Sequence, residues 1–307
     1  MKWEGHEQSQ NVEDRRGEGG GGLGGLGRLG GGGRRLGGGH GIGLGTIVIA
    51  LAAGWIFGIN PLTVLGFLGG GGGEVGPADM AVSTPGAAKA PPADDRAALF
   101  VSTVLRDTEV VWGQVFQSSG KTYQVPKLVL FRGVTRTACG TGESAMGPFY
   151  CPADGQVYID LAFYDTLKSR MGAPGDFAQA YVVAHEVGHH VQNLMGITAK
   201  IDGMRGKVPE AQMNALSVRV ELQADCLSGV WAHHSQRSKG WLEQGDIEEA
   251  LNAASQIGDD TLQRKSQGTV VPESFTHGSG AQRVSWFKRG LQADNVAQCD
   301  TFNSRQI

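Results

Sequence analysis

The sequence has no Cys-x-x-Cys pair and no strong excess of either charge. None of its four cysteines lies in such a pair, which argues against a zinc knuckle built from thiolates. The formal net charge is −3 at pH 7, and the C-terminal part has no basic stripe with interleaved aromatic residues. We therefore expect no nucleic acid partner, since such partners require concentrated positive charge.

Glycine, in contrast, is abundant. The chain has 50 glycines in 307 residues, more than twice the average usage of about 7%. Many precede residue 75, in runs such as 19–22 and 70–73. Such stretches supply no side chains for a core and cost the most backbone entropy to order. We expect one folded domain of about two hundred residues, at 97–307.

The region before this domain divides into three parts. Residues 1–40 are rich in glycine and arginine, and we expect a disordered cytoplasmic tail. Residues 41–59 form an uncharged run of 19, and apolar residues continue to 68. This length suits a transmembrane anchor at 41–68; a signal peptide and a buried core helix are the alternatives. Residues 69–96, rich in glycine, proline and alanine, read as a linker.

The arginines lie on the N-terminal side of the apolar run, and few positive residues follow it closely. The positive-inside rule then puts the N-terminus in the cytoplasm and the domain outside it. We expect a single-pass protein of the bacterial inner membrane, with a periplasmic or extracytoplasmic domain.

The domain has an α+β pattern, mainly helical with a small antiparallel or mixed sheet. Asp95 is a candidate N-cap for a helix that runs through Val111. Two segments are expected strands: 127–131, which is mostly apolar, and 156–160, which alternates in polarity. Four more helices are expected at 177–194, 209–234, 246–265 and 279–291, and a loop bracketed by Pro272 and Gly278 separates the last two.

The even number of cysteines suggests disulfides if the domain lies outside the cytoplasm. Cys139 and Cys151 flank a glycine-rich stretch, so a local bridge between them is natural. Cys226 and Cys299 would then pair by default. Four buried thiols are the alternative interpretation.

The motif with the clearest chemistry is His185-Glu186-x-x-His189. On a helix, residues i and i+4 share one face, so both imidazoles can reach one cation. Zinc prefers such ligands and keeps one position for water in catalytic sites, where Glu186 could act as the general base. The alternative is two histidines on a solvated helix face. His190 points about 100° away and is treated as a bystander.

A third protein ligand is needed, and no histidine follows at the short metzincin spacing. Glu221-Leu-Gln-Ala-Asp225 is the best candidate, because its two carboxylates also share a helix face. Glu221 can bind the metal, and Asp225 can accept a hydrogen bond from the second nitrogen of a ligand histidine. Alternatively, Glu221 pairs with Arg219 or another surface cation.

Taken together, several motifs resemble the neutral zinc metallopeptidase family of bacterial membrane-tethered proteins. The matching stretches are Cys139-Gly-Thr-Gly, Gly147-Pro-Phe-Tyr-Cys-Pro152, Val157-Tyr-Ile-Asp-Leu161, His185-Glu-Val-Gly-His-His-Val-Gln192, Glu221-Leu-Gln-Ala-Asp-Cys226 and Thr276-His-Gly-Ser-Gly-Ala-Gln-Arg283. The resemblance covers the expected anchor and the domain. It implies a zincin-like fold and a peptidase activity of the glutamate-zincin type.

Four further features bear on catalysis. The 156–160 strand comes shortly before the helix that carries His185 and His189, which we call the metal helix. In zincins, an edge strand in that position binds extended substrate. The strand could equally be an ordinary core strand. His277 lies in a Gly/Ser loop and could steady an oxyanion, or be a surface histidine. Arg283 could also stabilise the oxyanion, or it could form a salt bridge inside the fold. Tyr150 is a weaker candidate for the oxyanion role.

The sequence therefore predicts a metallopeptidase with one zinc ion per chain and Glu186 as the general base. Its expected partners are a peptide or protein substrate and the membrane, reached through a single N-terminal helix. Two other functions stay open: a non-catalytic, zinc-stabilised envelope scaffold or regulator, and a hydrolase of non-peptide amides. Replacing Glu186 by Gln distinguishes the peptidase from the scaffold, because only hydrolysis needs a general base.

Overall fold

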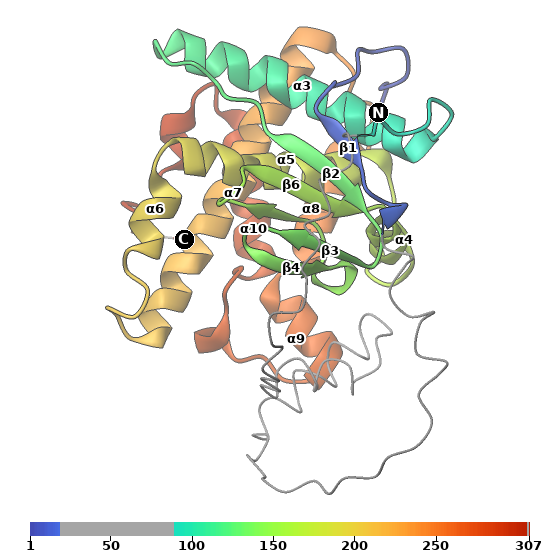
Figure 1. Cartoon of the computed structure of the whole chain (residues 1–307). Coiled ribbons are helices and arrows are strands. Elements are labelled where there is room, and N and C mark those ends of the chain that lie inside the picture. Colours follow the sequence, from blue (N-terminus) through green and yellow to red (C-terminus); the bar gives the residue numbers. More distant parts are fainter. Residues whose placement is uncertain (19–88, 306) are drawn as a thin grey trace, which may run out of the picture. The chain divides into compact units, whose positions relative to one another are not determined.

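The computed structural model of the chain describes residues 1–18, 89–305 and 307. Two segments, Met1–Gly17 and Lys89–Ile307, form one compact unit (Figure 1). The expected anchor at 41–68 lies outside the described residues, as does most of the expected linker. Within the described ranges, no helix combines the length and apolar character needed to cross a membrane.

A four-stranded mixed sheet has the order β1-β2-β6-β5. Its strands are β1 (Val12–Asp14), β2 (Lys127–Phe131), β6 (Gln156–Asp160) and β5 (Phe149–Cys151). The pairs β1–β2 and β2–β6 are parallel, and β5–β6 is antiparallel. Both expected strands are confirmed. A separate two-stranded sheet contains β3 (Val134–Thr137) and β4 (Gly140–Glu143).

The possibility that 156–160 is an edge strand is wrong. β6 pairs with β2 on one side and with β5 on the other, so both of its edges are already used. Leu128, Val157 and Ile159 are fully buried. The strand is therefore an interior one, and β5 takes the edge position beside it.

The expectation of disorder at 1–40 is wrong for the first 17 residues. β1 pairs with β2 in register, Val12 with Leu128 and Asp14 with Leu130. Figure 1 shows β1 in blue beside the green β2. The hydroxyl of Ser9 donates to Glu109 at 2.5 Å, which anchors the segment to the next element of the domain. The domain therefore includes residues 1–17, because this strand completes the sheet.

The first helix after residue 88 starts as expected. α3 (Arg96–Ser118) is capped by Asp95, whose carboxylate accepts from the backbone N–H of Ala98 at 3.0 Å. Arg16 forms ion pairs with Asp14 and Asp95, so the N-terminal segment also fastens the start of α3. The domain boundary consequently lies before residue 97, since Asp14 N–H also donates to the carbonyl of Lys89 at 2.7 Å.

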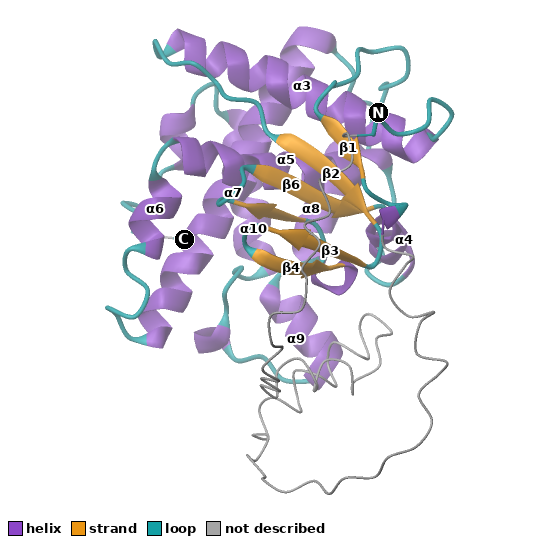
Figure 2. Cartoon of the chain, viewed as in Figure 1, coloured by secondary structure: helices purple, strands orange, loops and turns teal. Residues whose placement is uncertain are grey.

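The other long helices are close to the expected ones. They are α5 (Asp176–Leu194), α7 (Glu210–Lys239) and α10 (Gly280–Gln292), the last with a capping box from Ser279. Two short helices were not expected: α4 (Ala162–Ser169) and α6 (Ile197–Asp202). Figure 2 shows the orange strands gathered in front of α5, α7 and α10.

The single helix expected at 246–265 is instead two, α8 (Asp246–Gln256) and α9 (Asp259–Gln267). Gly258 lies at the break, and a Cβ there would collide with the backbone nitrogen of Gly280. The start of α10 thus passes so close that the chain must turn here. The break places Asp259 at the first residue of α9, facing the loop that precedes α10.

Glycines also allow the closest helix crossing. A Cβ on Gly290 of α10 would collide with the carbonyl oxygen of Cys226 on α7, and Gly229 is equally crowded by Phe287. The two backbones therefore pack directly against each other. This close approach brings Arg283 of α10 to the inner face of α7.

Candidate metal centre

Three side chains from two helices converge at one point. His185 and His189 lie on α5 and Glu221 on α7, and one ligand atom from each lies within 4.8 Å of the others. His185 Nε2 is 3.2 Å from one oxygen of Glu221, and His189 Nε2 is 3.5 Å from the other. A tetrahedral zinc ion with ligands at about 2.0–2.1 Å separates them by about 3.3 Å, so the group fits such an ion.

Gly188 makes this convergence possible. It lies between the two histidines on α5, and a Cβ there would be 3.1 Å from the carbonyl oxygen of Ala224 on α7. That distance is tighter than ordinary van der Waals contact. α7 can therefore approach closely enough for Glu221 to reach both imidazoles.

Electrostatics also favour a cation. Burial opposes charge on His185, but the Asp225 carboxylate outweighs it and raises the pKa of His185 to about 9. Burial alone would raise the pKa of Glu221, yet His189 and His185 lower it well below its usual value. The buried Glu221 carboxylate therefore favours positive charge at this point, which a divalent cation would supply.

Asp225 orients the first histidine as expected. Its Oδ1 lies 2.9 Å from His185 Nδ1, which leaves Nε2 directed at Glu221. Arg283 binds the same carboxylate, with Nε 2.9 Å from Oδ2 and Nη2 3.0 Å from Oδ1. The Tyr181 hydroxyl donates to Oδ1 at 2.5 Å. Arg283 therefore forms a salt bridge inside the fold, the second of its two expected roles.

Glu186 lies beside the ligand group, with 8% of its surface exposed. Burial raises the pKa of Glu186, and the neighbouring charges of His189 and His185 only partly counter this. A carboxylate with a raised pKa takes up a proton more readily than a surface one. Glu186 is therefore a buried carboxylate able to accept a proton beside the candidate ligand group.

His277 approaches the same group from the loop before α10. Its Nδ1 lies 3.2 Å from Asp259, and the backbone N–H groups of Thr276 and His277 donate to that carboxylate at 2.7 and 2.6 Å. About half of the His277 side chain is exposed. Burial opposes its charge, while Asp259 and Glu221 together raise its pKa. Asp259, which the sequence did not single out, thus fixes the loop and the imidazole.

The remaining candidates have structural partners. His190 faces away from the ligand group, as expected: its Nδ1 is 3.0 Å from the Tyr150 hydroxyl and its Nε2 is 2.6 Å from the carbonyl of Gln124. Tyr150 also accepts from Asn193 at 3.0 Å. Arg219 binds the carbonyls of Thr301 and Ser304. The alternative in which Glu221 pairs with Arg219 is therefore wrong.

Both expected disulfides are present. Cys139 pairs with Cys151, and Cys226 with Cys299. The first joins the turn of the β3–β4 hairpin to the edge strand β5. The second joins α7 to the C-terminal 3-10 helix η4 (Val296–Cys299). No cysteine in the described ranges is left as a thiol.

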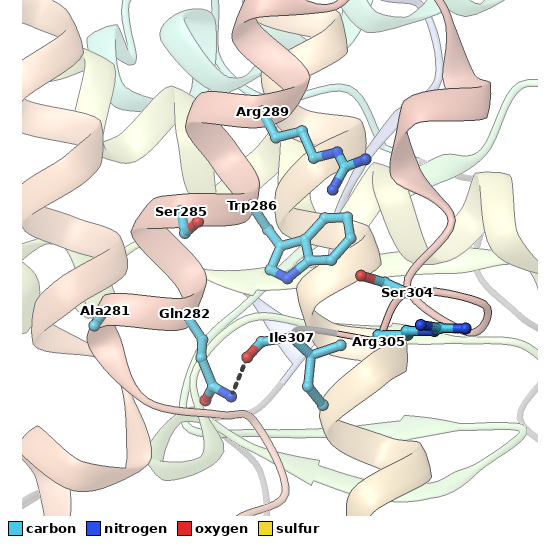
Figure 3. Close-up of a pocket in the computed structure, with 8 residues that line it drawn as sticks. All are labelled: Ala281, Gln282, Ser285, Trp286, Arg289, Ser304, Arg305 and Ile307. Carbon is cyan, nitrogen blue, oxygen red and sulfur yellow. Dashed lines mark hydrogen bonds between the residues drawn. The ribbon is translucent and has the colours of Figure 1, made fainter.

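A pocket on the outer side of α10 is separate from this centre. Figure 3 shows the Trp286 ring between Arg289 and Ile307, and a hydrogen bond of 3.0 Å from Gln282 to the Ile307 carbonyl. The Arg289 guanidinium lies 4.9 Å from the centre of the Trp286 ring. None of the residues that line the pocket belongs to the ligand group.

Two site residues escaped the sequence reasoning. Tyr181 lies one turn before His185 on the same face of α5, so helical spacing alone could have suggested it. Gln192 lies one turn after His189, where its Oε1 is 2.9 Å from His189 Nδ1. Both read as ordinary residues of an amphipathic helix, and only the packing of α7 gives them partners.

The fold and the ligand group define a protein with a candidate metal site, built on a His-Glu-x-x-His motif, in an α+β domain. A family described as "Putative neutral zinc metallopeptidase" matches residues 1–302, and the chain belongs to it. The match includes the N-terminal segment that completes the sheet.

Relatives in two genera extend this result. The chain is 53% identical over 303 residues to "Uncharacterized protein YpfJ" of Escherichia coli K12, covering 98% of this chain and 99% of that protein. It is 43% identical over 196 residues to "Uncharacterized protein Rv2575" of Mycobacterium tuberculosis H37Rv, covering 60% of this chain and 65% of that protein. No solved structure matches the chain.

Proposed function

We propose that this protein is a zinc-dependent peptidase that uses Glu186 as its general base. The observation that supports this best is the position of Glu186: a buried carboxylate of raised pKa beside three converging ligands. When bound by His185, His189 and Glu221, zinc would polarise a peptide carbonyl and make water a better nucleophile. Glu186 would take the proton of that water and pass it to the departing amine.

His277 is the proposed partner for the negative charge that develops on the carbonyl oxygen. Its imidazole is held by Asp259, half exposed, and charged over a wider pH range than a free histidine. A fixed cation beside a developing oxyanion stabilises the transition state more than the ground state. We give Arg283 no such role, since Asp225 already binds its guanidinium and the side chain is buried.

The substrate is proposed to bind in an extended form along β5. That strand is at the edge of the four-stranded sheet. Tyr150 in its centre contacts His190 and Asn193 of the metal helix, so the strand lies beside α5. An edge strand can recognise a peptide through main-chain hydrogen bonds, largely independent of sequence.

The domain is proposed to act outside the cytoplasm of a bacterium, attached to the inner membrane through the apolar segment 41–68. Its two disulfides support an oxidising compartment. The attachment itself is a prediction from the sequence.

The test uses the full-length chain in detergent, because a fragment that starts at residue 95 would lack β1. Zinc content and cleavage of a quenched-fluorescent peptide library are measured for the parent and for Glu186→Gln. We expect about one zinc per chain in both proteins, and cleavage by the parent only. His185→Ala is the control, expected to lose zinc and cleavage together.

Three results would change the conclusion. Equal cleavage by Glu186→Gln and the parent would remove Glu186 from the mechanism. Full zinc content with no cleavage by the parent would favour the alternative, a zinc-stabilised envelope scaffold. Cleavage of non-peptide amides instead of peptides would keep the chemistry and change the substrate class.

A further inference from the structure

The second ligand histidine is oriented by an amide instead of a carboxylate. Gln192 lies three residues after His189 on α5 and is fully buried. Its Nε2 donates to the main-chain carbonyl of Val220 at 2.7 Å, and its Oε1 is 2.9 Å from His189 Nδ1. A carbonyl can only accept, so the amide nitrogen must face Val220 and the oxygen must face the imidazole. His189 Nδ1 is therefore the donor, and its Nε2 lone pair is directed at the metal position.

This amide is itself held in place. Gln192 Nε2 also donates to the side-chain oxygen of Gln223 at 3.0 Å, and Gln223 Nε2 donates to the carbonyl of Cys299 at 2.9 Å. Cys299 is bonded to Cys226, which lies three residues after Gln223 on α7. The cysteines are fully buried and Gln223 is 5% exposed. A continuous buried path thus leads from the disulfide to the ligand.

We propose that Gln192 is the positioning residue of His189, and that Gln223 and the Cys226–Cys299 disulfide hold Gln192 in place. The inference rests on the proposed zinc site, since it assumes that His189 is a ligand. The two histidines then have unlike supports: His185 has the charged Asp225–Arg283 pair, and His189 a neutral amide chain fastened by a disulfide. Loss of an orienting partner typically weakens metal binding by about 10–100-fold.

The test measures the zinc dissociation constant of the full-length protein by competition with a chromophoric chelator. Gln192→Met keeps the volume but removes the acceptor, and we expect binding about 10–100-fold weaker. Gln192→Glu keeps an acceptor for His189 Nδ1, and we expect binding closer to the parent than that of Gln192→Met. A role in packing alone would give the opposite order, because Met suits a buried site better than a carboxylate.

A second arm tests the disulfide. We expect Cys226→Ser/Cys299→Ser to bind zinc more weakly than the parent. The matched control is Cys139→Ser/Cys151→Ser, which removes a bridge outside this path and should leave zinc affinity unchanged. Thermal unfolding of the zinc-free proteins checks that each variant folds; if Gln192→Met does not fold, Gln223→Met replaces it and should also weaken binding.

The outcomes separate this inference from the proposed function. Unchanged zinc affinity in folded Gln192→Met, with tight binding by the parent, overturns the positioning role alone. Equal loss in both disulfide variants overturns the part assigned to Cys226–Cys299. A folded parent that binds no zinc overturns the zinc site and this inference together.

A different observation supports a second inference, about membrane topology. The described N-terminal segment and the rest of the domain share one sheet: Glu13 of β1 pairs with Val129 of β2. The carbonyl of Asn11 accepts from the N–H of Leu128 at 2.8 Å, and Asn11 Nδ2 donates to Glu109 at 2.8 Å. Backbone hydrogen bonds span about 3 Å, whereas the hydrocarbon core of a bilayer is about 30 Å thick.

We propose that residues 1–17 and 89–307 lie in the same compartment. This replaces the orientation expected from the positive-inside rule, in which one crossing separates a cytoplasmic N-terminus from an external domain. The proposal is independent of the zinc site.

Cysteines introduced one at a time give a direct test in the full-length protein, expressed in a bacterium and probed in spheroplasts; the four native cysteines are in disulfides. Gln8 and Lys121 are both exposed, so Gln8→Cys and Lys121→Cys report the two segments to a membrane-impermeant maleimide. In intact spheroplasts, we expect either both variants or neither to be labelled. After permeabilisation, we expect both to be labelled. Labelling of one variant only in intact spheroplasts would overturn the proposal.

Discussion

Asp225 on α7 lies 2.9 Å from Nδ1 of His185 on α5, and the same carboxylate binds the buried guanidinium of Arg283. One side chain thus joins the metal helix, the helix of the third ligand and α10. It orients an imidazole and compensates a buried cation at once. Changes at this carboxylate should therefore affect both metal binding and folding.

The first prediction concerns that double role. Asp225→Asn removes the negative charge and leaves Arg283 buried without compensation, which we expect to cost about 3–5 kcal/mol of unfolding free energy. Urea unfolding of the zinc-free protein measures it. In a double-mutant cycle, adding Arg283→Met should recover part of the loss. Additive effects of the two substitutions would show that the pair is not coupled.

The second prediction concerns Glu221 as the third ligand. Glu221→Ala removes a ligand atom, so it should weaken zinc binding by more than the roughly 10–100-fold loss expected for an orienting partner. Glu210→Ala is the matched control: it is on the same helix, exposed, and at the first residue of α7. Chelator competition compares the two. Equal zinc affinity in both variants would require a different third ligand.

The third prediction concerns the crossing of α7 and α10. Gly290→Ala places a Cβ against the carbonyl of Cys226, so the helices must separate. We expect a loss of about 1–3 kcal/mol or more, as for other overpacked sites. Gly113→Ala on α3 has no neighbour within 4 Å and should be neutral or stabilising. Thermal unfolding of both variants provides the comparison, and similar melting temperatures would argue against the close crossing.

The fourth prediction concerns pH. Burial opposes ionisation of Asp259, but His277 lowers its pKa, so its contribution to stability is present above about pH 4 and is lost as pH falls through the lowered value. The raised pKa of His277 gives a contribution that is full below about pH 6.5 and lost at higher pH. The pair should therefore stabilise the zinc-free protein most between about pH 4 and 6.5.

Asp259→Asn tests this window. The difference in melting temperature between the parent and the variant should be largest inside it and should shrink on both sides. Asp260→Asn, at the neighbouring position of α9, is the control for a general helix-end effect. A difference that does not vary with pH would mean that the loop is held by hydrogen bonds to Asp259 without a contribution from charge.

Local sequence determined the elements that bear the ligands. The spacing of His185 and His189 places both on one helix face, and the cap at Asp95 marks the start of α3. These signals act over a few residues, through helical periodicity and a backbone hydrogen bond, so they can be read without knowledge of the fold. The same holds for β2 and β6, whose bounds match the expected segments.

Tertiary structure decided what those elements meet. The parallel pairing of β1 with β2 joins residues more than a hundred positions apart, and nothing in the polar, charged neighbourhood of Val12 indicates a strand. The choice between two roles for Arg283, the partner of Gln192 and the break at Gly258 all depend on which backbone passes nearby. Sequence thus specified the ligands of the candidate metal site, whereas long-range packing specified the side chains that orient them.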